Sequence, residues 1–124
     1  MKDTDKESPN STFDPEELLA RVENDHELLQ DLLVIFKEEF PGHLQALREA
    51  VESGEGKRVA AAAHALKGML SNLAATQAAA AAAKLEQLGR NGEVSQFQEA
   101  FALIETNASK LLPQLEAYMA EANK

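Results

Sequence analysis

The chain has 124 residues, no cysteine and a formal net charge of −9. This length suits one domain, and the absence of cysteine excludes disulfides and thiolate metal sites. The acidic balance argues against a nucleic-acid partner and against anionic lipid, because both require a basic surface. No apolar run is long enough for membrane insertion, and the polar start lacks the apolar stretch of a signal peptide, so we expect a cytoplasmic protein.

The first part of the chain divides into a polar segment and two helices. Residues 1–12 show no periodicity and predict a disordered segment ahead of a helical domain over residues 13–122. Asp14 and Pro15 have the residue types of an N-cap and a first helical position, which predicts a short helix. A long helix is expected over residues 25–53, with an apolar residue every three or four positions: Leu29, Leu33, Phe36, Phe40, Leu44, Leu47 and Val51.

Two features of this stretch bear on where helices end. Pro41 falls inside the long helix, but the apolar stripe keeps its phase, so we expect a kink. Gly54 has the residue type of a helix end. Further helices are expected over about residues 57–73, 77–89 and 93–121, with a turn at residues 89–92. The last helix carries a stripe at Val94, Phe97, Phe101, Ile104, Ala108, Leu111, Leu115 and Tyr118.

Apolar spacings that alternate between three and four residues are typical of antiparallel helix bundles. We therefore expect an all-α protein, an antiparallel up-and-down four-helix bundle with a short extra N-terminal helix. The connections are short, and the alanine-rich fourth helix would let its neighbours approach closely. A closed core of this kind needs no second subunit, so a monomer is expected.

The helix over residues 57–73 has two different faces. Its apolar face is expected to be buried and comprises Val59, Ala62, Leu66, Met69, Leu70 and Leu73. The opposite face carries His64, Lys67, Gly68 and Ser71. A glycine inside a helix costs about 1 kcal/mol relative to alanine. Because Gly68 points away from the apolar stripe, a functional need for open space at this surface explains the glycine better than close helix packing does.

The outward face suits chemistry at the His64 imidazole. Neutral imidazole is a nucleophile without a separate base, and a phosphoryl group on it would be met by the Lys67 cation one turn along. His26 and His43 have no companions at metal-ligand spacing and are expected to be surface residues. The sequence contains no glycine-rich phosphate loop and no nucleotide-binding motif.

The residues of this face also carry a family resemblance. The run His64-Ala65-Leu66-Lys67-Gly68, followed by Asn72-Leu73-Ala74-Ala75, resembles the H-x-L-K-G…N-L-G-A signature of histidine-containing phosphotransfer (HPt) domains. Residues 84–89, KLEQLG, are similar to the L-E-x-x-G close of the following helix in that family. The resemblance covers about residues 14–120. The chain departs from the pattern at Met69 and Leu70, where the family often has small residues, and at Ala74, where the family has glycine.

The resemblance implies a function and a site. His64 would be the phosphoacceptor, with Lys67 and Gly68 as supporting residues and Ser71 beside them on the same face. A polar residue of the next helix, near Glu86 or Gln87, would hydrogen-bond the imidazole.

The resemblance also implies the partners. The protein would pass phosphoryl from aspartate to histidine to aspartate without being an enzyme that uses ATP. Its partners would be receiver domains of response regulators or hybrid sensor kinases. It would have no cofactor of its own, because the receiver supplies the Mg²⁺.

Two other functions fit a helical bundle of this kind. One is a non-catalytic scaffold or interaction bundle in which His64 is incidental, and its binding would be indifferent to His64 and Lys67. The other is the substrate-histidine domain of a chemotaxis-type kinase, which would require a separate ATP-binding domain.

Overall fold

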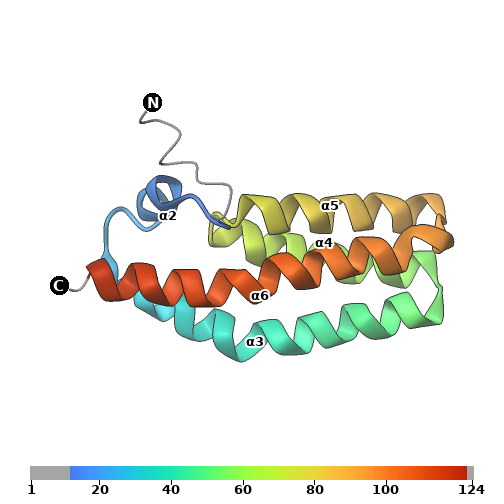
Figure 1. Cartoon of the computed structure of the whole chain (residues 1–124), viewed down its shortest axis with the longest axis horizontal. Helices are drawn as coiled ribbons and strands as arrows, with labels where there is room; N and C mark the ends of the chain where they lie inside the picture. Colours follow the sequence, from blue (N-terminus) through green and yellow to red (C-terminus); the bar gives the residue numbers. More distant parts are fainter. Residues whose placement is uncertain (1–11, 123–124) are drawn as a thin grey trace.

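The computed structural model describes residues 12–122, which form helices and connecting turns without a strand. The expected disorder of residues 1–11 lies outside this part of the chain. The elements in order are α2 (Pro15–Arg21), α3 (His26–Ser53), α4 (Gly56–Asn72), α5 (Thr76–Asn91), the 3₁₀ turn η1 (Val94–Gln96) and α6 (Phe97–Ala122). Helices α3 to α6 lie side by side as an antiparallel bundle, and α2 sits at the end where α4 meets α5 (Figure 1). The predicted fold class is confirmed.

Local signals fix the helix ends. The Asp14 side chain accepts from the backbone amides of the first turn of α2, at 3.1 and 3.2 Å, and Pro15 opens that helix. Helix α3 continues through Pro41 and ends at Gly54, whose φ of 74° is left-handed. None of the helices described is long and apolar enough to cross a membrane.

Most residues of the predicted stripes form the core, whereas Leu44, Ala108 and Tyr118 are only partly buried against it. In α4 the fully buried positions are Val59, Ala63, Leu66 and Leu70. Met69 and Ala62, expected on the buried face, are only partly buried, because they lie at the rim of that stripe. The expectation for Val94 was wrong: it is 51% exposed, because it belongs to the 3₁₀ turn and not to the helical phase of α6.

Helices α4 and α5 make the most extensive contact of any two elements described. Both helices bury small side chains: Ala63 of α4 and Ala78 and Ala82 of α5 are fully buried. Gly89 lies in this contact and is helical, so the turn expected at residues 89–92 was wrong. Helix α5 continues to Asn91 and ends at Gly92, whose φ is 70°. The close approach keeps Gly89 inside the helix and buried against α4.

The residues before α2 are bound to the bundle at three points. The backbone amide and the hydroxyl of Thr12 both donate to Gln114 Oε1, at 2.8 Å each, and Thr12 is 2% exposed. The Phe13 ring meets Tyr118 edge to face. The Asp14 amide donates to the Ala74 carbonyl at 2.9 Å. Thr12 therefore belongs to the folded domain and not to the disordered segment predicted to include it.

Candidate functional site

His64 projects from the outer face of α4. Its side chain is 65% exposed, whereas Leu66 and Leu70 on the other side of the helix are fully buried. The 3.6-residue period of the helix separates these positions, so burial of the leucines turns the imidazole towards solvent. The structure thus places His64 on the exposed face that the sequence predicted.

A buried carboxylate from α5 contacts the imidazole. Glu86 is 5% exposed, and its Oε2 lies 3.1 Å from His64 Nδ1. The same oxygen accepts from Arg90 Nη2 at 2.6 Å, and Oε1 lies 2.9 Å from Lys67 Nζ. These four residues are the His64 cluster. Because α4 and α5 lie close together, Glu86 on α5 reaches both His64 and Lys67 on α4.

The charges of the cluster fix the state of Glu86. The Lys67 ammonium beside Oε1 holds the pKa of Glu86 below its ordinary value, and the contact with His64 acts in the same direction. Burial opposes both by raising the pKa of this carboxyl, but the net direction is downward. An ionised carboxylate has no proton to donate, so the proton in the His64–Glu86 hydrogen bond is on Nδ1. In the neutral ring, Nε2 then keeps its lone pair.

The remaining residues singled out from the sequence take different positions. A Cβ on Gly68 would meet nothing within 4 Å, so helix packing does not explain this glycine. Gln87, the alternative to Glu86, is exposed and its amide donates to Asn91 Oδ1 at 3.4 Å. Ser71 lies half-buried on the same face of α4, and the His64 cluster is complete without it.

Arg90 was missed in the sequence analysis, because residues 89–92 were expected to form a turn. Once α5 extends to Asn91, Arg90 follows Glu86 by four positions, and such pairs face one another on a helix. The i, i+4 spacing was the signal that could have found it. Its side chain is 62% exposed, so it brings a cation to the surface beside the imidazole.

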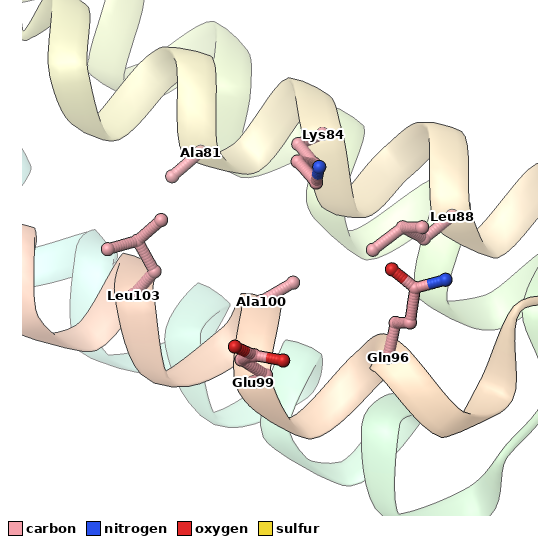
Figure 2. A pocket seen from close by; sticks show the side chains of 7 residues that line it. All are labelled: Ala81, Lys84, Leu88, Gln96, Glu99, Ala100 and Leu103. Atoms are coloured by element: carbon pink, nitrogen blue, oxygen red, sulfur yellow. The ribbon is translucent and has the colours of Figure 1, made fainter.

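Two other features lie apart from this cluster. Within residues 12–122, no group of three or more His, Asp or Glu side chains is arranged to hold a metal ion. A cavity of about 260 Å³ opens between α5 and α6 (Figure 2). None of the cluster residues lines it; the lining side chains are Ala81, Lys84, Leu88, Gln96, Glu99, Ala100 and Leu103.

Comparisons with known proteins agree with the resemblance. The chain is similar in fold to the crystal structure of histidine-containing phosphotransfer protein B (HptB) from Pseudomonas aeruginosa PAO1, with a TM-score of 0.82 and 22% identity over 92% of this chain and 97% of that one. A comparison with curated proteins finds no match. The family model described as "Hpt domain" matches residues 31–123, which is most of the chain. The chain therefore belongs to the Hpt domain family, the histidine phosphotransfer proteins of phosphorelays.

Proposed function

We propose that this protein accepts a phosphoryl group on His64 Nε2 from the aspartyl phosphate of one receiver domain and passes it to an aspartate of another. One observation carries the proposal: an exposed imidazole donates from Nδ1 to a buried, ionised glutamate, at 3.1 Å. This hydrogen bond leaves Nε2 as the nitrogen with the free lone pair. Among the three histidines, only His64 has such a partner within the described residues.

The transfer balances without another reactant. The Nε2 lone pair forms a bond to phosphorus while the bond from phosphorus to the aspartate oxygen breaks, and the aspartate leaves as a carboxylate. The phosphorylated ring keeps its Nδ1 proton and carries a positive charge, which Glu86 Oε2 faces. The reverse sequence delivers the phosphoryl group to the next aspartate.

The cations of the cluster suit a phosphorylated state. Lys67 and Arg90 together carry two positive charges against the one negative charge of Glu86, so the group next to the ring has a net positive charge. A phosphoryl group brings negative charge to the same place. In the free protein, both cations are engaged with Glu86, so Lys67 supports the carboxylate before any phosphoryl group arrives.

The surface beside His64 leaves room for a partner. Gly68 follows His64 by one turn and is exposed, with open space where a side chain would be. A receiver would bring the aspartate and a bound Mg²⁺, which stabilises the charge on the transferred group. Its interface would cover the exposed face of α4 with an apolar centre and a polar rim.

The proposal is tested by phosphoryl transfer from a labelled receiver. The protein is mixed with receiver domains of its source organism that carry labelled aspartyl phosphate, and acid-labile, base-stable label is followed. Wild type is expected to accept label, and His64→Gln is expected to accept none. His43→Gln and His26→Gln are the matched controls and should behave as wild type. Equal labelling of His64→Gln and wild type would contradict the proposal.

The same assay separates the relay from the chemotaxis-type alternative. Direct labelling of His64 by a separate kinase core and ATP, without a receiver, would favour the substrate-histidine domain. Binding of a partner that is unaffected by His64→Gln and by Lys67→Gln, with no labelling, would favour the scaffold.

A further inference from the structure

Helices α4 and α5 meet backbone to backbone at two glycines. A Cβ on Gly89 would lie 2.8 Å from the Ala60 nitrogen and 2.8 Å from the Gly56 carbonyl oxygen. A Cβ on Gly56 would clash in the same way with the Gly89 carbonyl oxygen. Real Cβ atoms do not approach so closely, and a backbone neighbour cannot rotate away as a side chain can. Either substitution must therefore move the two helices apart.

This crossing lies next to the His64 cluster. Ala60 precedes His64 by four residues and Gly89 follows Glu86 by three, so one helical turn separates the glycine contact from the hydrogen bond. We propose that Gly56 and Gly89 are positioning residues, which set the spacing of α4 and α5 at which the Glu86 carboxylate reaches His64 Nδ1. The expected effect on phosphoryl transfer rests on the function proposed above, whereas the effect on the hydrogen bond does not.

The size of the effect follows from the geometry. The tight turn at Leu73–Ala75 joins the two helices and acts as the pivot; Gly89 lies about 21 Å from it along α5 and Glu86 about 17 Å. A methyl at Gly89 needs its 2.8 Å contacts to reach ordinary van der Waals distance, an opening of about 0.6 Å or more. Because Glu86 lies nearer to the turn than Gly89 does, the separation of the helices at Glu86 increases by about 0.5 Å. The Nδ1–Oε2 distance then grows from 3.1 Å to about 3.6 Å, beyond the range of a good N–H···O hydrogen bond.

Glu86 cannot easily follow the ring. Its side chain is 6% exposed, and Oε2 is shared between His64 on α4 and Arg90 on its own helix. A rotation that restores the contact with the ring would lengthen the 2.6 Å contact with Arg90. The hydrogen bond to the imidazole therefore depends on the separation of the helices.

The test is Gly89→Ala, read by ¹⁵N NMR of the His64 ring and by the phosphoryl-acceptance assay. In wild type the neutral ring should carry its proton on Nδ1. In Gly89→Ala the ring should move towards the tautomer mixture of a free imidazole, and acceptance should slow by about tenfold, the value of one such hydrogen bond. Gly42→Ala is the matched control, because Gly42 is also helical but has nothing within 4 Å. It should leave both readouts unchanged.

The outcomes separate this inference from the proposed function. If Gly89→Ala is folded by circular dichroism and keeps the wild-type tautomer, the positioning role is wrong. If Gly89→Ala does not fold, Gly56→Ala is read in its place, because a Cβ there meets the Gly89 carbonyl oxygen from the other side of the same crossing. A folded Gly56→Ala that keeps the wild-type tautomer would overturn the positioning role. If the tautomer changes as expected but wild type accepts phosphoryl from no receiver, the positioning role stands and the proposed function fails.

Discussion

His64 and Glu86 are 22 residues apart in the sequence, yet Nδ1 of the ring lies 3.1 Å from Oε2 of the carboxylate. The first residue is on the exposed face of α4 and the second is buried on α5. The contact orients the ring and assigns its proton, so the chemistry proposed for this protein depends on a residue outside the histidine motif.

Removal of Glu86 should slow phosphoryl acceptance without removing the acceptor. In Glu86→Ala, Nδ1 loses its partner and Lys67 and Arg90 lose theirs. A hydrogen bond to a charged group contributes about 1.5–3 kcal/mol, so we expect a loss of about tenfold to a hundredfold in the initial rate. Glu86→Gln keeps an oxygen that can accept from Nδ1 and should lose less. Gln87→Ala, at the exposed neighbouring position, should match wild type; equal rates for Glu86→Ala and wild type would contradict the role of Glu86.

Ionisation of Glu86 should make the fold sensitive to acid. The pKa of Glu86 in the folded protein is below the reference value of 4.5, so the unfolded chain binds its proton more readily. The ionised Glu86 therefore stabilises the folded state above about pH 4.5. This stabilisation is lost as the pH falls through the pKa that Glu86 has in the folded protein.

The measurement is thermal unfolding of wild type and Glu86→Gln between pH 7 and pH 3. The melting temperature of the variant should fall less steeply below pH 4.5, because it has no carboxyl at this position. Glu52→Gln, at an exposed position of α3, is the control and should leave the wild-type slope unchanged. A slope in Glu86→Gln as steep as that of wild type would mean that other carboxyl groups carry the acid sensitivity.

Loss of Arg90 should slow phosphoryl acceptance. Arg90 Nη2 lies 2.6 Å from Glu86 Oε2, the oxygen that also contacts His64. Without this cation, Lys67 only balances the charge of Glu86, so the group next to the ring has no net positive charge to meet a phosphoryl group. Acceptance by Arg90→Gln should therefore be slower than acceptance by wild type, measured as the initial rate of labelling. Arg58→Gln, exposed on α4, serves as control; equal rates for Arg90→Gln and wild type would contradict the role of Arg90.

Ala74 should tolerate glycine better than its neighbour does. Its φ of 54° is left-handed, which costs an L-residue about 1–2 kcal/mol, and glycine would relieve this cost. Loss of a buried methyl costs about 0.8 kcal/mol, and the added freedom of the unfolded chain about 0.4–1 kcal/mol. Ala74→Gly should thus stay within about 0.5 kcal/mol of wild type in unfolding free energy.

The control for this prediction is Ala75→Gly. Ala75 is equally buried, but its φ is −85°, so glycine relieves nothing there. We expect this variant to lose about 1–2 kcal/mol of stability in denaturant unfolding. Equal destabilisation of the two variants would show that the Ala74 conformation stores no strain.

The architecture could be predicted because apolar periodicity determines which face of a helix is buried. The stripes of α3 and α6 keep their phase past Pro41 and Pro113, and both helices are continuous there. The exposed position of His64 followed from the buried position of Leu66 on the same helix. These expectations depend only on the spacing of residues along one helix, which can be read from the sequence.

Features that depend on two helices were harder to predict. Gly89 resembles a turn residue in the sequence, and only the backbone of α4 explains why it is helical and buried. The extension of α5 that follows from this places Arg90 beside Glu86, so one error in a helix boundary hid a site residue. The choice between Glu86 and Gln87 also required the rotation of α5 against α4, which no single-helix pattern contains.

The contacts of Thr12 and Asp14 affect how the domain can be excised or fused. A fragment that starts at Phe13 would leave Gln114 without two of its donors. A fragment that starts at Pro15 would also lose the hydrogen bond from the Asp14 amide to the Ala74 carbonyl, in the turn between α4 and α5. Affinity tags, fluorescent labels and chimeric junctions therefore belong upstream of Thr12, where the native hydrogen bonds of the bundle are kept.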